Sequence, residues 1–248
     1  RQFSAFSPTA TAVITPIPER LELYLNFGMG FHSNQAQVAL ADGRVITRPD
    51  GTSFTLHALP RFYGGELGAR THLFDRVDLA AAFWLSYLEN ETVFDADAAA
   101  FVPSDPTRRI GFDLEARARI LSWLYADLDL AQASATAVPD QGNGGAVALA
   151  PKIYVTGGLT VKHKSGVRAG LRFRYVGERP AFDETSPEYQ YFTSRTLPNG
   201  APNPDYDPSR VIAQGYFIVD AYVAYRWRWL EGSASAQNLF NSQWREAQ

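Results

Sequence analysis

The chain has 248 residues, with 46% hydrophobic and 20% charged side chains and a net charge of -3 at pH 7. It is too apolar to be disordered and has no basic excess, so no nucleic-acid partner is expected. It has no cysteine, which excludes disulfides and thiolate metal sites. No segment approaches the roughly 20 apolar residues of a membrane-spanning helix. Residues 1–3 do not start a signal peptide, so the chain is either mature or cut from a longer one.

Most of the chain alternates between apolar and polar residues, which predicts β-strands with one apolar face. A ragged run at 6–15 precedes a clear one at 21–29, where Leu21, Leu23, Leu25, Phe27 and Met29 alternate with positions that include Glu22, Asn26 and Gly28. Similar runs follow in chain order at 66–74, 77–89, 110–120, 124–130, 151–162, 167–175, 217–228 and 230–237. The sequence therefore predicts about ten strands.

The length of the runs and the spacing between them favour a membrane protein. Several runs reach the 9 to 11 residues, approximately, that a tilted membrane strand needs. Short turns at 16–20, 75–76, 122–123, 165–166 and near 229 alternate with long connections at about 30–65, 90–107, 137–150 and 178–213. Outer-membrane barrels have short periplasmic turns and long extracellular loops. We therefore expect an all-β protein, an antiparallel transmembrane β-barrel.

The polar positions of these strands carry charges of both signs, which would line the lumen of such a barrel. The row Asp113, Glu115, Arg117, Arg119 could be taken for an acid/base set, but a ladder pairing with charges on adjacent strands is the favoured interpretation. The predicted lumen wall consists of Glu22, Glu66, Arg70, Asp113, Glu115, Arg117, Arg119, Arg168, Arg172, Arg174, Asp220 and Arg226.

Tyrosines and tryptophans gather near the predicted strand ends. They are Tyr24, Tyr87, Trp123, Tyr175, Tyr216, Trp227 and Trp229. Because such rings favour the membrane interface, this placement predicts aromatic girdles. The alternative is that aromatic residues are common in any strand.

Four segments resemble motifs of TonB-dependent receptors. Residues 23–34 are similar to the family's "Y-x-N-x-G-x-G-F-H-S-N", and 65–70 to an "E-x-G-x-R" strand. Residues 89–94 with 107–116 look like the hairpin that follows, and 237–241 like the "N-L-F-D/N" near the family's C-terminus. The resemblance covers essentially the whole chain. It implies that residues 1–248 are part of a 22-stranded barrel domain, about strands 12 to 21, without the plug domain and the last strand.

The resemblance also implies a function: active transport across the outer membrane of a Gram-negative bacterium. The solute would be scarce, such as a ferric siderophore, cobalamin or another metal chelate. Energy would come from the TonB–ExbB–ExbD complex, acting through a TonB box and the receptor's own plug domain. The lumen wall would hold the plug, and Arg168, Arg172 and Arg174 would contact plug acids or an anionic substrate. Outer-membrane lipid would surround the barrel. The expected ligand contacts in extracellular loops are His32, Asn34, Tyr63, Phe182, Tyr189 and Tyr191.

Two alternatives to a transport receptor remain open. A complete small barrel, acting as a passive channel or adhesin, would need residues 6–15 to pair with 230–239. An outer-membrane lipase or protease is the weakest alternative, because no Gly-x-Ser-x-Gly motif occurs. His32, His57, His72 and His163 lack metal-ligand spacing, and Asp95 with Asp97 lack the rest of a calcium loop. We therefore expect no enzyme, no cofactor and no metal site.

Overall fold

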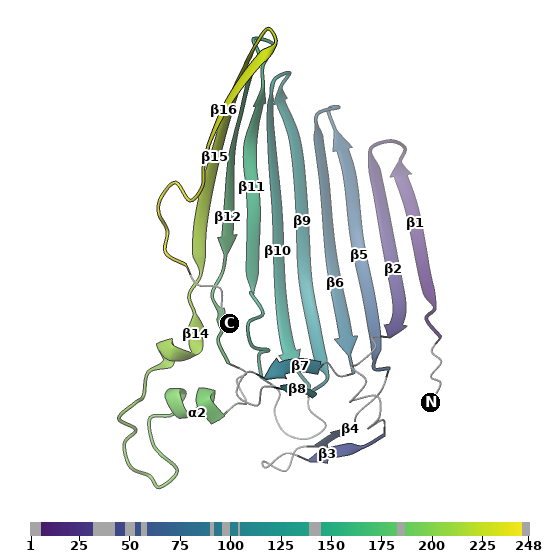
Figure 1. Cartoon of the computed structure of the whole chain (residues 1–248). Coiled ribbons are helices and arrows are strands. Elements are labelled where there is room, and N and C mark those ends of the chain that lie inside the picture. Colours follow the sequence, from purple (N-terminus) through teal and green to yellow (C-terminus); the bar gives the residue numbers. More distant parts are fainter. Residues whose placement is uncertain are drawn as a thin grey trace.

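The computed structural model describes residues 6–31, 43–47, 53–55, 59–89, 92–95, 100–103, 105–138, 145–182 and 187–244. Ten strands form one sheet in the order β1-β2-β5-β6-β9-β10-β11-β12-β15-β16, and each pair is antiparallel (Figure 1). Each long strand lies beside the next one along the chain, which makes the sheet an up-and-down meander. The ten predicted strands are thus confirmed.

The strands have the length that membrane crossing needs, since nine of the ten contain at least nine residues. Their bounds are β1 (Thr9–Ile17), β2 (Leu21–Phe31), β5 (Arg61–Leu73), β6 (Val77–Leu88), β9 (Thr107–Leu121), β10 (Leu124–Ala137), β11 (Ile153–Lys162), β12 (Val167–Val176), β15 (Tyr216–Trp227) and β16 (Leu230–Ala236).

Short turns and long connections lie at opposite ends of the sheet, as predicted (Figure 1). One turn requires glycine: Gly166 has a φ of 93°, and a Cβ there would lie 2.3 Å from the backbone oxygen of Arg226. The loop end carries β3 (Val45–Thr47), β4 (Ser53–Thr55), β7 (Thr92–Asp95), β8 (Ala100–Pro103), β13 (Arg179–Pro180), α2 (Pro187–Thr193), the 3-10 helix η1 (Pro208–Val211) and β14 (Ile212–Ala213).

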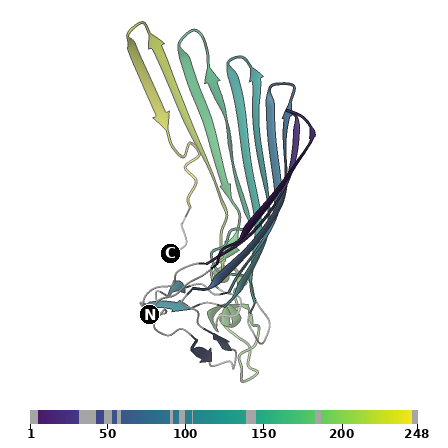
Figure 2. The ribbon, with the colours of Figure 1, turned by 90° about the vertical axis from the view of Figure 1, so that its right-hand side faces the viewer.

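The sheet is curved and open, with β1 at one edge and β16 at the other (Figure 2). Every residue of both edge strands is exposed. Among the described strands, β1 pairs only with β2, and β16 pairs only with β15. The closure that a complete small barrel requires is therefore not present in the sheet that the structure describes.

No helix within the described ranges is both long and apolar enough to cross a membrane.

Candidate functional site: the charged face of the sheet

The register of the sheet defines two faces, because residues paired across antiparallel strands point to the same side. Glu22 pairs with Arg70, Arg70 with Ala80, Ala80 with Glu115, and Glu115 with Asp129. The same rows continue through β11 and β12 to β15. All twelve residues of the predicted lumen wall therefore lie on one side, which we call the charged face.

The opposite side, the apolar face, carries large hydrophobic side chains that no described segment covers. Leu25 is 55% exposed and Leu67 is 59% exposed, and Phe83, Leu171 and Val223 are similarly open. Soluble monomers rarely expose a contiguous apolar patch of more than a few hundred Å². This surface extends over the whole sheet, so its natural environment is the hydrocarbon of a membrane.

Ion pairs between strands hold the charged face together. Arg172 Nη1 donates to Asp127, at 2.6 Å from Oδ1 and 2.7 Å from Oδ2, and the Asp127 side chain is only 17% exposed. Arg117 Nη2 lies 2.6 Å from Asp129 Oδ1, which relieves the direct opposition of Glu115 and Asp129. The Arg117–Asp129 pair is of the kind that the ladder interpretation predicts for the row on β9.

A second group of pairs lies near the turn end. Glu231 binds both Arg226, at 3.0 Å, and Arg168. Arg70 Nη1 lies 3.4 Å from Glu22 Oε1. Sequence reasoning missed Asp127, Asp129 and Glu231 as members of the wall, although Asp127 and Asp129 alternate with leucines in the same two-residue period.

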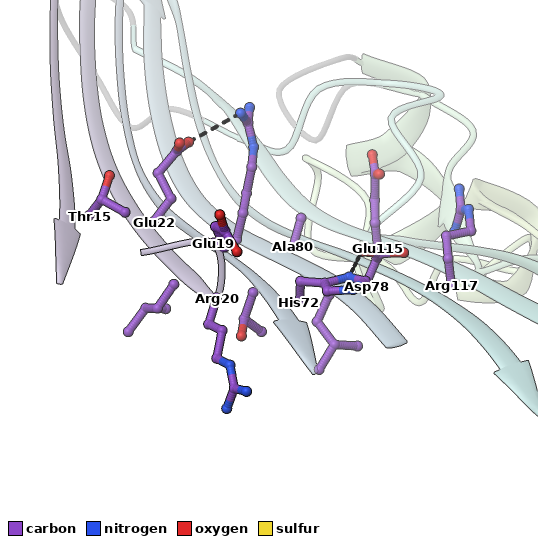
Figure 3. Close-up of a pocket in the computed structure, with 13 residues that line it drawn as sticks. Thr15, Glu19, Arg20, Glu22, His72, Asp78, Ala80, Glu115 and Arg117 are labelled. Carbon is purple, nitrogen blue, oxygen red and sulfur yellow. Dashed lines mark hydrogen bonds and ion pairs between the residues drawn. The ribbon is translucent and has the colours of Figure 1, made fainter. Parts of the chain in front are cut away.

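The charged face has a hollow of about 460 Å³ close to the turn end, between β2, β5, β6 and β9 (Figure 3). Ala80, Glu115 and Arg117 line it, and the small side chain of Ala80 leaves space between longer ones. His72 also lines it, with Nδ1 2.6 Å from Asp78 Oδ1. Within the described ranges, no group of three acidic, histidine or cysteine side chains could hold a metal ion.

The loop after β13 contains Phe182, which is exposed, and α2 carries Tyr189 and Tyr191. The Tyr191 hydroxyl donates to Asp205 at 2.7 Å, and this hydrogen bond raises the pKa of Tyr191, with burial and the Asp205 charge adding to it. Asn203 Nδ2 donates to the backbone oxygens of Tyr191 and Ser194. This loop is therefore held by its own hydrogen bonds. His32 and Asn34 lie outside the described residues.

Two sequence predictions about aromatic residues need correction. Tyr63 is not in a loop: it belongs to β5 and pairs with Met29 and Tyr87 on the apolar face. Tyr24 and Tyr216 were expected in the interface girdle, but both point to the charged face. The Tyr24 ring instead packs over Gly68 and beneath the Arg70 guanidinium, 4.8 Å from the ring centre. In each case the strand register decides the face, and proximity to a strand end does not.

A meander with one lipid-facing side, one charged side, and turns segregated from loops is a segment of an outer-membrane β-barrel. Residues 1–241 match the family described as "TonB dependent receptor-like, beta-barrel". The chain belongs to this family, whose members are receptors and not enzymes. The chain is thus part of an outer-membrane barrel.

Solved structures share this fold at low sequence identity. The ferric-catecholate import receptor Fiu of E. coli K12, in its closed form, is 19% identical with a TM-score of 0.61, over 94% of this chain and 30% of that one. The ferripyoverdine receptor of Pseudomonas aeruginosa is 14% identical, with a TM-score of 0.64 over 97% of this chain and 30% of that one.

The copper transporter OprC is 17% identical, with a TM-score of 0.67 over 97% of this chain and 34% of that one. The chain therefore spans about a third of the length of these proteins. A comparison with curated proteins finds no match.

Proposed function

We propose that the protein is an active transport receptor that imports a metal chelate through the outer membrane. The observation that carries the proposal is the charged face, a wall of cross-strand ion pairs behind a lipid-facing surface, in a chain of the TonB-dependent receptor family. Such a wall suits a polar lumen. The solved structures with this fold are a ferric-catecholate import receptor, a ferripyoverdine receptor and a copper transporter, which supports a ferric siderophore as the solute. Cobalamin or another metal chelate rests on the family resemblance alone.

The twelve residues of the predicted lumen wall would face a plug domain of the same receptor. Six of the twelve, Glu22, Arg70, Arg117, Arg168, Arg172 and Arg226, form ion pairs with charged residues of the same face. Half of this polar surface therefore has its counter-charges already in place. Arg119 and Arg174 have no carboxylate partner among the described residues. Arg119 donates to the backbone oxygen of Asp75, whereas Arg174 has only the rings of Tyr216 and Trp244, 6.0 Å from each ring centre. Arg174 is therefore the best position for a plug carboxylate or an anionic chelate in transit.

Ligand contacts in this proposal come from the loop end. Tyr189, Tyr191 and Phe182 lie in the connection between β12 and β15, and His32 with Asn34 follow β2 in the sequence. Tyr63 faces lipid and is no longer a candidate. Energy would reach the plug from the TonB–ExbB–ExbD complex.

Uptake of labelled chelates tests the proposal in cells that carry the full-length receptor as their only such protein. We expect accumulation of ferric siderophore or cobalamin in energised cells and loss of accumulation when TonB is deleted. Uptake that persists without TonB would indicate a passive channel and would overturn the proposal.

A crosslinking experiment tests the assignment of the faces to lumen and lipid. This chain has no cysteine, so a single cysteine introduced into it is unique within it. Ala82→Cys lies on the charged face opposite Asp113, whereas Ala81→Cys lies on the apolar face opposite Leu114. We expect Ala82→Cys to crosslink to the plug domain of the full-length receptor and Ala81→Cys to react only with a lipid-soluble reagent. The reverse pattern would contradict the assignment.

A further inference from the structure

The apolar face carries two charged side chains in the ten described strands, and both are arginines. Arg61 lies on this face because it pairs with Phe31, and Arg108 because it pairs with Tyr87. Every other residue on the apolar face of these ten strands is uncharged. Both arginines are exposed and lie at the loop end of their strands. An unpaired charge in hydrocarbon is costly, so their height along the strands matters.

Arg108 lies at the edge of the apolar band that is nearer the loop end. Ten residues separate it from Ala118, which pairs with Val77 beside a turn. At about 3.4 Å per residue and a tilt of about 40°, this run rises about 26 Å, close to the roughly 25 Å of a typical apolar band. On β10, the outward positions become polar at the same height: Ser134 pairs with Ile110, and Thr136 pairs with Arg108. Both arginines therefore reach the headgroup layer on the loop side.

The two arginines also lie close to each other. They are on β5 and β9, separated by β6 alone, and Arg61 is two residues from Tyr63, which shares a row with Arg108. Their backbones are therefore about 12 Å apart. Between them lie Tyr63 and Tyr87, which pair directly and have ring centres 6.3 Å apart. Tyrosine is amphipathic and favours this depth. Together the four side chains form one outward patch, the Arg–Tyr patch.

The Arg–Tyr patch carries a net positive charge. Within the described part of the chain, the Arg108 side chain forms no ion pair. Arg61 has Glu89 beside it, and the carboxylate of Glu89 accepts a hydrogen bond from the backbone N–H of Arg61 at 2.9 Å. Glu89 therefore offsets part of the charge of Arg61. No described carboxylate is in contact with Arg108. A guanidinium binds phosphate oxygens through two parallel N–H donors, which suits an anionic headgroup.

We propose that the Arg–Tyr patch binds the phosphate of a phosphorylated glycolipid, lipopolysaccharide, in the outer leaflet of the outer membrane. Arg108 is the principal phosphate contact and Arg61 assists it. Tyr63 and Tyr87 pack against the sugar and acyl boundary of the lipid. The patch faces away from the lumen, so it is independent of the proposed transport path.

Lipid retention by the full-length receptor tests the proposal. The receptor is purified from outer membranes in a mild detergent, and bound lipopolysaccharide is counted by native mass spectrometry. We expect Arg61→Gln with Arg108→Gln to lower the retained lipid about tenfold, a change equivalent to losing one charge-assisted contact. Arg109→Gln is the matched control, because Arg109 is the next residue on β9 but pairs with Ser86 on the charged face. Equal retention in the double variant and the control would overturn the proposal.

Two further arms sharpen this experiment. Glu89→Gln should increase retention, because it removes the acid beside Arg61 while an amide oxygen still accepts the hydrogen bond. A large excess of inorganic phosphate should leave the bound lipid in place. Displacement of the lipid by phosphate would show a general anion site and would also overturn the proposal. Equal electrophoretic heat-modifiability of all variants confirms that each has assembled.

Discussion

The two faces of the sheet are built on the same strands, yet they satisfy opposite requirements. On the apolar face, Phe173 packs beside Phe217, with ring centres 5.9 Å apart, and neither needs a polar partner. On the charged face, Arg172 is one residue away and has its partner in Asp127. Because a strand alternates its side chains, a single residue step moves from a lipid environment to a polar one. A charge is therefore tolerated at one position and costly at the next.

The largest expected effect comes from placing a charge on the apolar face. Phe173→Arg should cost about 2–4 kcal/mol near the bilayer midplane, because the guanidinium has no partner in lipid. Arg172→Gln removes a charge from the other face and should cost about 1 kcal/mol through the lost bond to Asp127. Assembly of the full-length receptor in outer membranes measures both. Similar losses for the two variants would contradict the face assignment.

Packing on the charged face can be tested through glycine. In Gly68→Ala, the new Cβ would lie 2.2 Å from the Tyr24 ring, which is buried and has Arg70 above it. We expect a loss of about 1–3 kcal/mol in the free energy of unfolding. Gly65→Ala is the control on the apolar face, where the nearest atom would be 3.8 Å away, and it should stay within about 0.5 kcal/mol. Denaturant unfolding in detergent distinguishes them.

The ion pairs of the charged face should differ in strength according to their exposure. A double-mutant cycle on Arg172 and Asp127 should give a coupling of about 1 kcal/mol, because Asp127 is mostly covered. The same cycle on Arg70 and Glu22 should give less than about 0.5 kcal/mol, since that pair is longer and more open. Equal couplings would show that burial does not control these interactions.

The smallest effect concerns the loop end, which belongs to neither face. The pKa of Tyr191 is raised, so its hydrogen bond to Asp205 is fully present below the ordinary tyrosine pKa, about 10. That stabilisation is lost as the pH rises through the raised pKa. Ultraviolet titration of the unmodified protein and of Tyr191→Phe should show that the phenol removed in the variant ionises above about pH 10. Ionisation of Tyr191 at or below pH 10 would exclude the bond in solution.

Local alternation was enough to determine the strands and most of the two faces. Residues 110–120 predict both the strand and its charged side, because a period of two depends only on the chain itself. The separation of turns from loops was readable for the same reason. All twelve predicted wall residues consequently lie on the same side of the sheet.

Only the tertiary structure decided which residues meet. Arg172 and Asp127 are 45 residues apart in the sequence, and nothing local identifies them as partners. Register also moved Tyr63 from an expected ligand loop to the apolar face and placed Tyr24 over Gly68. It brought Arg61 and Arg108 into one outward patch. Pairing between strands depends on contacts distant in sequence, and a shift of one residue would exchange the two faces of a strand.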